Sequence, residues 1–127
     1  MGNREFKLAL EKRTLGFVVR VVRFVAGLKY NPVNSVLGKQ LLRSATSIGA
    51  NYREANRAES RADFTHKIGV VEKEAAETVY WLDIFLQIDN TSEESGGAIQ
   101  PLRDEAVGLL KLFTTISKKV KDSSRVR

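Results

Sequence analysis

The segment Gln40–Glu59 constrains the fold most, because it is predicted to form one long helix with two opposed faces. Successive residues of an α-helix are rotated by about 100°, which gathers the apolar side chains of this region into an arc of about 80°. The members of this apolar face are Leu37, Leu41, Ala45, Ile48, Tyr52 and Ala55. A helix with one apolar face needs neighbours that cover it, so the segment predicts a core built from packed helices.

The opposite arc of the same predicted helix, also about 80° wide, is a row of basic residues. Its members are Lys39, Arg43, Arg53, Arg57 and Arg61. Such a row suits contact with a nucleic-acid backbone, because each phosphate that a cation neutralises releases counterions. A solvated helix face and pairing with acidic residues of a neighbouring helix or subunit are the alternatives. Arg13, Arg20 and Arg23 would widen the row if the first two helices share an outer surface.

Apolar residues at helical spacing predict four helices, over residues 3–29, 33–61, 63–89 and 100–121. Pro32 and Pro101 are predicted to open the helices that contain them, and Asp63 is predicted as an N-cap. The valine-rich run 18–22 also has strand propensity, but the helical spacing on both sides of it favours a helix. Together these elements predict one domain over residues 1–127, an all-α, antiparallel, up-and-down four-helix bundle.

The charge balance favours an acidic partner. The chain has 21 Lys and Arg against 15 Asp and Glu, a net charge of +6, which is typical of a nucleic-acid-binding domain and also of a basic but inert surface. It has no cysteine, which suits a reducing compartment. The apolar run Leu15–Leu28 is interrupted by Arg20 and Arg23 and is too short to span a bilayer. We therefore expect a cytoplasmic protein with no membrane partner.

No catalytic, metal or cofactor site is predicted. His66 is the only histidine, and its D-x-x-H spacing with Asp63 is half of a bundle metal site whose second half is missing. One histidine without a cysteine leaves no recognisable catalytic triad. The pair Gly96-Gly97 lacks the Lys-Ser/Thr of a phosphate loop. We therefore expect no enzyme, no cofactor and no small-molecule substrate.

Asn51 and Glu54 form an N-x-x-E pair on the flank of the second helix. We expect this pair to bridge to a neighbouring helix or subunit by hydrogen bonds. The other interpretation of Glu54, a catalytic carboxylate, has no partner set in the sequence.

Tyr80, Trp81 and Phe85 form an aromatic cluster late in the third helix. A stacking platform for bases is one interpretation. We favour core packing or a subunit contact, because Leu82 and Leu86 lie on the same side of the helix.

Two motifs resemble a known family: the segment 43–51, RSATSIGAN, followed by Glu54, and the element Glu77-Thr78-x-x-Trp81-Leu82. They are similar to the four-helix-bundle proteins encoded in intervening sequences of bacterial large-subunit ribosomal RNA genes. The resemblance implies a small bacterial cytosolic bundle that assembles as a homopentameric ring. A related bundle, the accessory variability determinant of retroelements, works with nucleic acid.

Two hypotheses follow. In the first, the chain is a non-enzymatic homo-oligomer, a pentamer, that binds RNA or DNA backbone through its basic helix face. In the second, it is a structural or protein-interaction ring with no nucleic-acid role, and its cations contact the acidic third helix of a neighbour.

Overall fold

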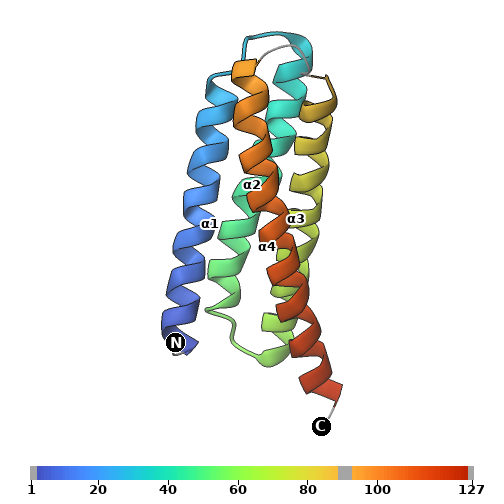
Figure 1. Cartoon of the computed structure of the whole chain (residues 1–127). Coiled ribbons are helices and arrows are strands. Elements are labelled where there is room, and N and C mark those ends of the chain that lie inside the picture. Colours follow the sequence, from blue (N-terminus) through green and yellow to red (C-terminus); the bar gives the residue numbers. More distant parts are fainter. Residues whose placement is uncertain (1–2, 89–92, 126–127) are drawn as a thin grey trace.

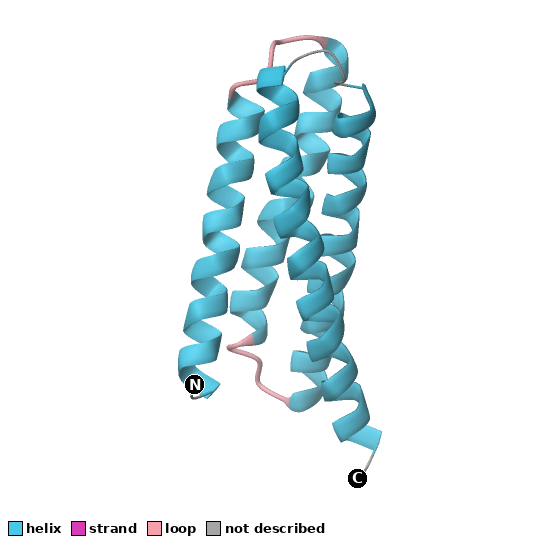
Figure 2. Ribbon diagram, viewed as in Figure 1, coloured by secondary structure: helices cyan, strands magenta, loops and turns pink. Residues whose placement is uncertain are grey.

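The computed structural model describes residues 3–88 and 93–125, and these residues form four helices. They are α1 (Asn3–Ala26), α2 (Pro32–Ala55), α3 (Arg61–Ile88) and α4 (Glu93–Arg125). The helices run alternately up and down, so that both chain ends lie at the same end of the bundle (Figure 1). Within the described residues there is no strand, and short loops join α1 to α2 and α2 to α3 (Figure 2). The predicted all-α four-helix bundle is confirmed.

Each helix packs against its two neighbours in the order α1, α2, α3, α4, and α4 closes the bundle against α1. The predicted apolar face of α2 lies in the core: Leu41, Ala45, Ile48, Tyr52 and Ala55 are at most 2% exposed. Leu37, near the start of α2, is only partly buried. Burial of this apolar surface is the main force that holds the four helices together.

Two aromatic pairs cross the core along its diagonals. Phe24 of α1 meets Phe85 of α3 with ring centroids 5.3 Å apart and ring planes at 89°. Tyr52 of α2 meets Phe113 of α4 at 5.2 Å and 63°. Edge-to-face contacts of this kind are favourable beyond the area that they bury, so they help to fix how opposite helices face each other.

The start of α2 follows the prediction. Asn31 has an extended backbone, with φ −160° and ψ 165°, and its side-chain oxygen accepts a hydrogen bond of 2.8 Å from the backbone N–H of Asn34. Pro32 occupies the first helical turn, where its missing N–H costs nothing. The preceding helix, α1, ends at Ala26 instead of residue 29, and the N–H groups that follow tighten to bonds three residues back, from Gly27 to the carbonyl of Phe24 and from Leu28 to that of Val25.

The connection between α2 and α3 differs from the prediction. Helix α2 ends at Ala55, not near residue 61, and the next N–H groups tighten into a turn: Arg57 bonds to the carbonyl of Glu54 and Ala58 to that of Ala55. Helix α3 begins at Arg61. Its cap is Ser60, whose hydroxyl accepts from the N–H of Asp63 at 3.0 Å, so the prediction that Asp63 is the N-cap was wrong.

The bounds of α4 also differ. Pro101 was predicted to open this helix, near residue 100, but α4 begins at Glu93 and continues through Pro101 to Arg125, beyond the predicted end at residue 121. A proline inside a helix leaves the carbonyl four residues earlier without its donor. That carbonyl belongs to Gly97, which is exposed and can bond to water. The predicted end of the third helix, residue 89, lies outside the described residues.

Candidate interaction surfaces

The predicted row of five cations does not lie along one helix. Arg57 follows the end of α2 and Arg61 begins α3, so only Lys39, Arg43 and Arg53 belong to α2. The geometry on which the row was predicted is therefore wrong. The five residues would share one face only if α2 continued to residue 61, but it ends at Ala55.

Arg43 is engaged by carboxylates of α3. Its guanidinium forms an ion pair with Glu74 at 3.3 Å and a second ion pair with Glu77. Hydrogen bonding to Glu77 is the main cause that raises the pKa of Arg43 above its ordinary value. Arg43 therefore helps to hold α2 against α3. For this residue the structure agrees with the alternative given above, in which a cation of the row pairs with acidic residues of a neighbouring helix.

A buried hydrogen bond lies directly beside this ion pair. The hydroxyls of Thr78 and Ser44 share a hydrogen bond of 2.9 Å. The Thr78 hydroxyl also lies 2.8 Å from the carbonyl oxygen of Glu74, and the Ser44 hydroxyl 3.2 Å from that of Leu41, each in its own helix. Thr78 and Ser44 are both 0% exposed. We call Arg43, Ser44, Glu74, Glu77 and Thr78 the α2–α3 polar contact. The two sequence motifs that carry the family resemblance thus meet in space.

The other cations of the predicted row have separate environments. Arg53 lies 3.7 Å from Glu11 of α1. Arg61 donates to the hydroxyl of Ser123 in α4. Among the described residues, no carboxylate forms an ion pair with Lys39 or Arg57, and both are exposed. The predicted row is thus divided between pairs inside the bundle and two isolated exposed cations.

Arg13, Arg20 and Arg23 were predicted to widen the row, and they divide in the same way. Arg13 faces α4, where its guanidinium donates two hydrogen bonds, of 2.9 and 2.8 Å, to Glu105. This hydrogen bonding is the main cause that raises the pKa of Arg13. Arg20 and Arg23 are exposed, and neither forms an ion pair within the described part of the chain. Of these three arginines, Arg20 and Arg23 therefore remain candidates for a ligand-binding role.

The outer side of α1 carries an exposed apolar row. Its members are Leu8, Leu15, Val19 and Val22, which are 38–56% exposed. On an ideal helix they span about 60°, and Lys12, Arg20 and Arg23 occupy the next arc of about 80°, on the side away from α2. We call the first set the α1 apolar row and the second the α1 cations. The α1 apolar row is therefore a candidate contact surface, because large contiguous apolar patches are rare on monomeric proteins.

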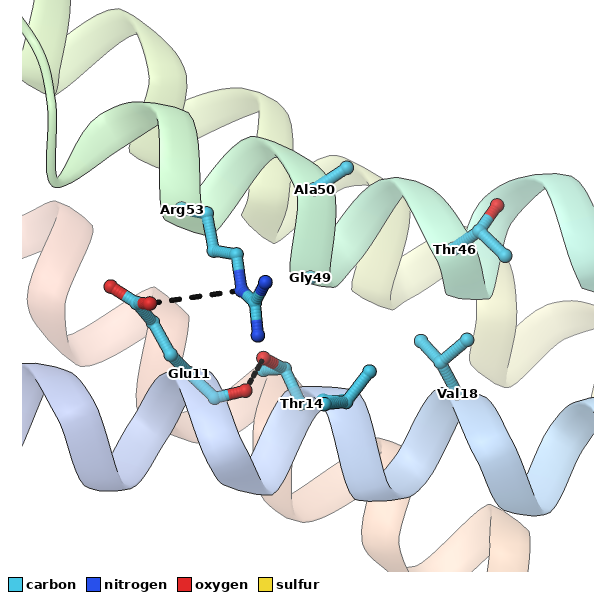
Figure 3. Close-up of a pocket in the computed structure, with 8 residues that line it drawn as sticks. Glu11, Thr14, Val18, Thr46, Gly49, Ala50 and Arg53 are labelled. Carbon is cyan, nitrogen blue, oxygen red and sulfur yellow. Dashed lines mark hydrogen bonds and ion pairs between the residues drawn. The ribbon is translucent and has the colours of Figure 1, made fainter.

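A pocket of about 280 Å³ lies between α1 and α2, beside the α1 apolar row. Figure 3 shows its lining, with Val18 on α1 facing Thr46 and Gly49 on α2. Arg53 reaches toward Glu11 at one end of the pocket, next to Thr14. The pocket is therefore mostly apolar, with a charged pair at one end only.

Asn51 and Glu54 do different things. The Asn51 side chain donates to the carbonyl of Ser47 in its own helix, at 2.9 Å, so it forms no bridge to a neighbouring helix there. Glu54 accepts a 2.9 Å hydrogen bond from Lys67 of α3. That bond is the main cause that raises the pKa of Lys67. Glu54 thus joins α2 to α3 at a separate point, closer to the α2–α3 connection than the α2–α3 polar contact is.

The aromatic cluster is split between core and surface. Phe85 is 1% exposed, Trp81 is partly buried, and Tyr80 is 59% exposed. The Tyr80 and Trp81 rings meet edge to face, with centroids 5.2 Å apart. The Trp81 indole N–H donates to Glu77 at 3.4 Å. Tyr80 therefore stands on the surface of α3, supported on one side by a partly buried neighbour.

Several of these partners were not found from the sequence. Glu74, Glu77 and Glu105 were counted as acidic residues, but their arginine partners were not assigned. The sequence did hold a clue to the partners of Arg43: Glu74 and Glu77 are three residues apart, so they share one face of α3. Within residues 3–88 and 93–125, no group of three or more metal-ligating side chains comes together, and His66 is exposed. In the same ranges no helix is long and apolar enough to cross a membrane.

Comparison with known proteins identifies the family. Residues 7–112 match the sequence profile described as 23S rRNA-intervening sequence protein. The chain belongs to this family. In this 23S rRNA-intervening sequence protein family member, all residues of the α2–α3 polar contact lie within the matched range. No curated protein sequence matches the chain significantly.

A solved structure supports the same assignment for this family member. It is the crystal structure of a protein of unknown function from the S23 ribosomal protein family, from Bacteroides thetaiotaomicron VPI-5482. The two sequences are 37% identical, the match covers 88% of this chain and 97% of the other, and the TM-score is 0.76. The shared architecture is therefore the four-helix bundle over nearly its full length.

Proposed function

We propose that the chain is a non-enzymatic bundle that associates with copies of itself, as a pentameric ring, and binds the backbone of RNA or DNA. The observation that carries this proposal is the outer side of α1, where an exposed apolar row runs beside cations that form no ion pair with the described carboxylates. The apolar row supports association with another protein surface, and the cations beside it support polyanion binding. Neither property requires a catalytic group.

The charge pattern of the α1–α2 hairpin supports polyanion binding. From Lys12 to Arg53 the chain has eight basic residues and no acidic one. Intramolecular ion pairs occupy Arg13, Arg43 and Arg53 of this set. Because the α1 cations lie on the side of the apolar row that faces away from α2, they stay accessible when a partner covers that row. Five copies of a +6 chain would carry about +30, enough for strongly salt-dependent binding.

RNA is the first polyanion to test, since the matched family description refers to 23S rRNA and the similar solved structure to a ribosomal protein family. We expect unstructured, fluorescently labelled RNA to bind with a Kd of about 1 μM or tighter at low salt, and binding to weaken steeply as salt rises. Fluorescence anisotropy over a salt series measures both quantities. Absence of binding at low salt, or tight binding that ignores salt, contradicts the proposal.

The α1 cations can be tested against a charge-matched control. Arg20→Glu combined with Arg23→Glu should weaken RNA binding at least about tenfold at low salt and lower the slope of log K against log salt by about 2. Lys118→Glu combined with Lys119→Glu makes the same change of charge on exposed positions of α4. Equal losses in both variants would indicate that net charge alone, and not the α1 cations, drives binding.

The second candidate is an interaction ring with no nucleic-acid role, which the ion pairs of Arg43 and Lys67 favour, since they show basic residues engaged by carboxylates of a neighbouring helix. Light scattering across a salt series separates the two candidates. An assembly that dissociates as salt rises uses its cations at the subunit contact. An assembly that keeps its mass while RNA is released uses them for the polyanion.

A further inference from the structure

We propose that Tyr30, in the loop between α1 and α2, stacks against an unpaired base of single-stranded RNA. This inference rests on the polyanion binding proposed above and adds a preference for single strands over duplexes. The loop lies at the end of the bundle away from both chain ends (Figure 2). It combines an exposed tyrosine, a pocket beside the tyrosine, and lysines that form no ion pair in the described part of the chain.

Tyr30 is exposed although the backbone around it is held. Its side chain is 88% exposed, and within the described residues no other large hydrophobic side chain is as exposed. The side-chain amide of Asn34 donates to the carbonyl of Lys29 at 2.8 Å, and the backbone N–H of Asn34 donates to the side-chain oxygen of Asn31, also at 2.8 Å. Asn34 thus fixes the residues on both sides of Tyr30. The backbone therefore loses little conformational freedom when a flat partner covers the phenol ring.

A pocket of about 210 Å³ lies beside Tyr30, between the end of α1 and the start of α2. Tyr30 is among its lining residues, and Val25, Leu28 and Leu42 give it apolar surface. A cavity of about 150 Å³ holds benzene, so this pocket admits the six-membered ring of a base beside the phenol. Because every base has a π-face, an aromatic ring in such a place accepts bases without reading their sequence.

Lysines flank the same pocket. Lys29 lines it from the loop and Lys39 from α2. Both are exposed, neither forms an ion pair within residues 3–88 and 93–125, and no described carboxylate lines the pocket. A nucleotide whose base stacks on Tyr30 would bring its neighbouring phosphates toward these ammonium groups. Arg23 lies only about 4.5 Å of helix rise before the end of α1, so a strand that contacts the α1 cations can continue to the loop.

Tyr80 on α3 is the natural comparison for Tyr30. It is also exposed, at 59%. The charged residues one turn before and after it are Glu77 and Asp83, and both carboxylates are already in ion pairs with arginines. Tyr80 thus offers an exposed ring without flanking lysines. Substitution of Tyr80 is therefore the matched control for substitution of Tyr30.

The test measures binding of two probes to the full chain by fluorescence anisotropy, an oligouridine of about 12 nucleotides and a fully paired RNA duplex of the same length. Tyr30→Ala should weaken binding of the oligouridine at least about fivefold and change binding of the duplex less than about twofold, because only the single strand offers an unpaired base. Tyr30→Phe keeps the ring and should bind both probes like the wild type. Tyr80→Ala should do the same.

A salt series separates stacking from charge. Tyr30→Ala should lower the affinity for oligouridine by the same factor at each salt concentration, because no phosphate contact is lost. Lys29→Gln combined with Lys39→Gln should lower the slope of log K against log salt by about 1.4, since each phosphate contact on a single strand contributes about 0.7. In Tyr30→Trp, where Trp81 is the only other tryptophan, oligouridine should quench the added emission.

The possible failures are distinguishable. A Tyr30→Ala protein that binds oligouridine like the wild type overturns the stacking and leaves the proposed polyanion binding intact. Equal losses for the oligouridine and the duplex also overturn the stacking, because such a contact needs no unpaired base. If light scattering shows that Tyr30→Ala lowers the mass of the assembly, Tyr30 belongs to a protein contact and not to an RNA site. A wild-type chain that binds neither probe at low salt overturns the polyanion binding itself.

Discussion

At the scale of single residues, the α2–α3 polar contact shows how a short motif determines the pairing of two helices. Arg43 and Ser44 are neighbours in sequence, as are Glu77 and Thr78, and each partner of one pair meets a partner of the other. An ion pair at the surface and a hydrogen bond in the core thus fix the same register. The hydrogen bond is the part that solvent cannot replace, because both hydroxyls are fully buried.

Thr78→Val tests this bond. The substitution keeps the shape of the side chain and removes its hydrogen bonds to Ser44 and to the carbonyl of Glu74 in the same helix, so we expect the free energy of unfolding to fall by about 1 kcal/mol. Chemical denaturation measures the change. Thr115→Val is the control: its hydroxyl donates only to the carbonyl of Lys111 in its own exposed helix face, and the change should stay within about 0.5 kcal/mol. Equal losses in the two variants would show that the interhelix bond adds no stability.

Tyr52 gives a prediction about pH. Burial is the main cause that raises the pKa of its phenol above the ordinary value, while the hydrogen bond with Asn56 lowers it. The folded state therefore favours the protonated phenol, so its contribution to stability is complete below pH 10 and is lost as the pH rises through the raised pKa. Relative to Tyr52→Phe, the wild type should lose up to about 1.4 kcal/mol per pH unit in that window. Denaturation at pH 8 and at successive steps above pH 10 measures the difference, and parallel curves would contradict it.

At the scale of helices, the sequence predicts the existence and type of each element better than its ends. The apolar spacing identified all four helices. In α2, for example, Leu41, Ile48 and Tyr52 fall on one face of a helix, whereas a strand would place them on both faces. The ends depend on contacts that lie far apart in sequence. Asn56, just after α2, donates to Glu11 of α1 at 2.9 Å, and no local signal announces this bond. The missed end of α2 is what removed Arg57 and Arg61 from the predicted row.

Glycines within the helices give a prediction at this scale. A Cβ on Gly16 of α1 would meet nothing within 4 Å, whereas a Cβ on Gly38 of α2 would lie 3.0 Å from Val25. Gly16→Ala should therefore gain about 1 kcal/mol from helix propensity alone. Gly38→Ala should be less stable than Gly16→Ala by at least about 1 kcal/mol, since Val25 must move. Thermal unfolding compares them, and equal melting temperatures would mean that the α1–α2 contact is looser than it is here.

At the scale of the whole molecule, charge is distributed unevenly over a regular bundle. Periodicity predicted the bundle, but no pattern within one helix shows which carboxylates face it from the next. Arg13, Arg43 and Arg53 form ion pairs with carboxylates of neighbouring helices, whereas the α1 cations stay exposed without such a pair in the described part of the chain. The candidate polyanion surface therefore moves from α2 to α1, and Lys12, which was not among the predicted binding residues, joins it.

This distribution predicts how salt acts on the intact molecule. The ion pairs inside the bundle are at or near the surface and contribute little each, so the melting temperature should change by only a few degrees between about 50 and 500 mM salt. RNA binding should fall by orders of magnitude over the same range. Measuring both on one sample separates the two effects. A bundle that melts far more easily at high salt would show that its surface pairs, and not its core, hold it together.

The start of α1 and the end of α4 lie at the same end of the molecule, and the end of α4 extends beyond the other helices (Figure 1). A purification tag or fluorescent protein fused to either terminus would project from the end that also holds the α2–α3 connection. The opposite end, with the Asn31-capped start of α2, would stay unobstructed. The two ends could also be joined by a flexible linker that spans the distance between them and the chain reopened at the α1–α2 loop, so that α1 becomes the last helix made instead of the first.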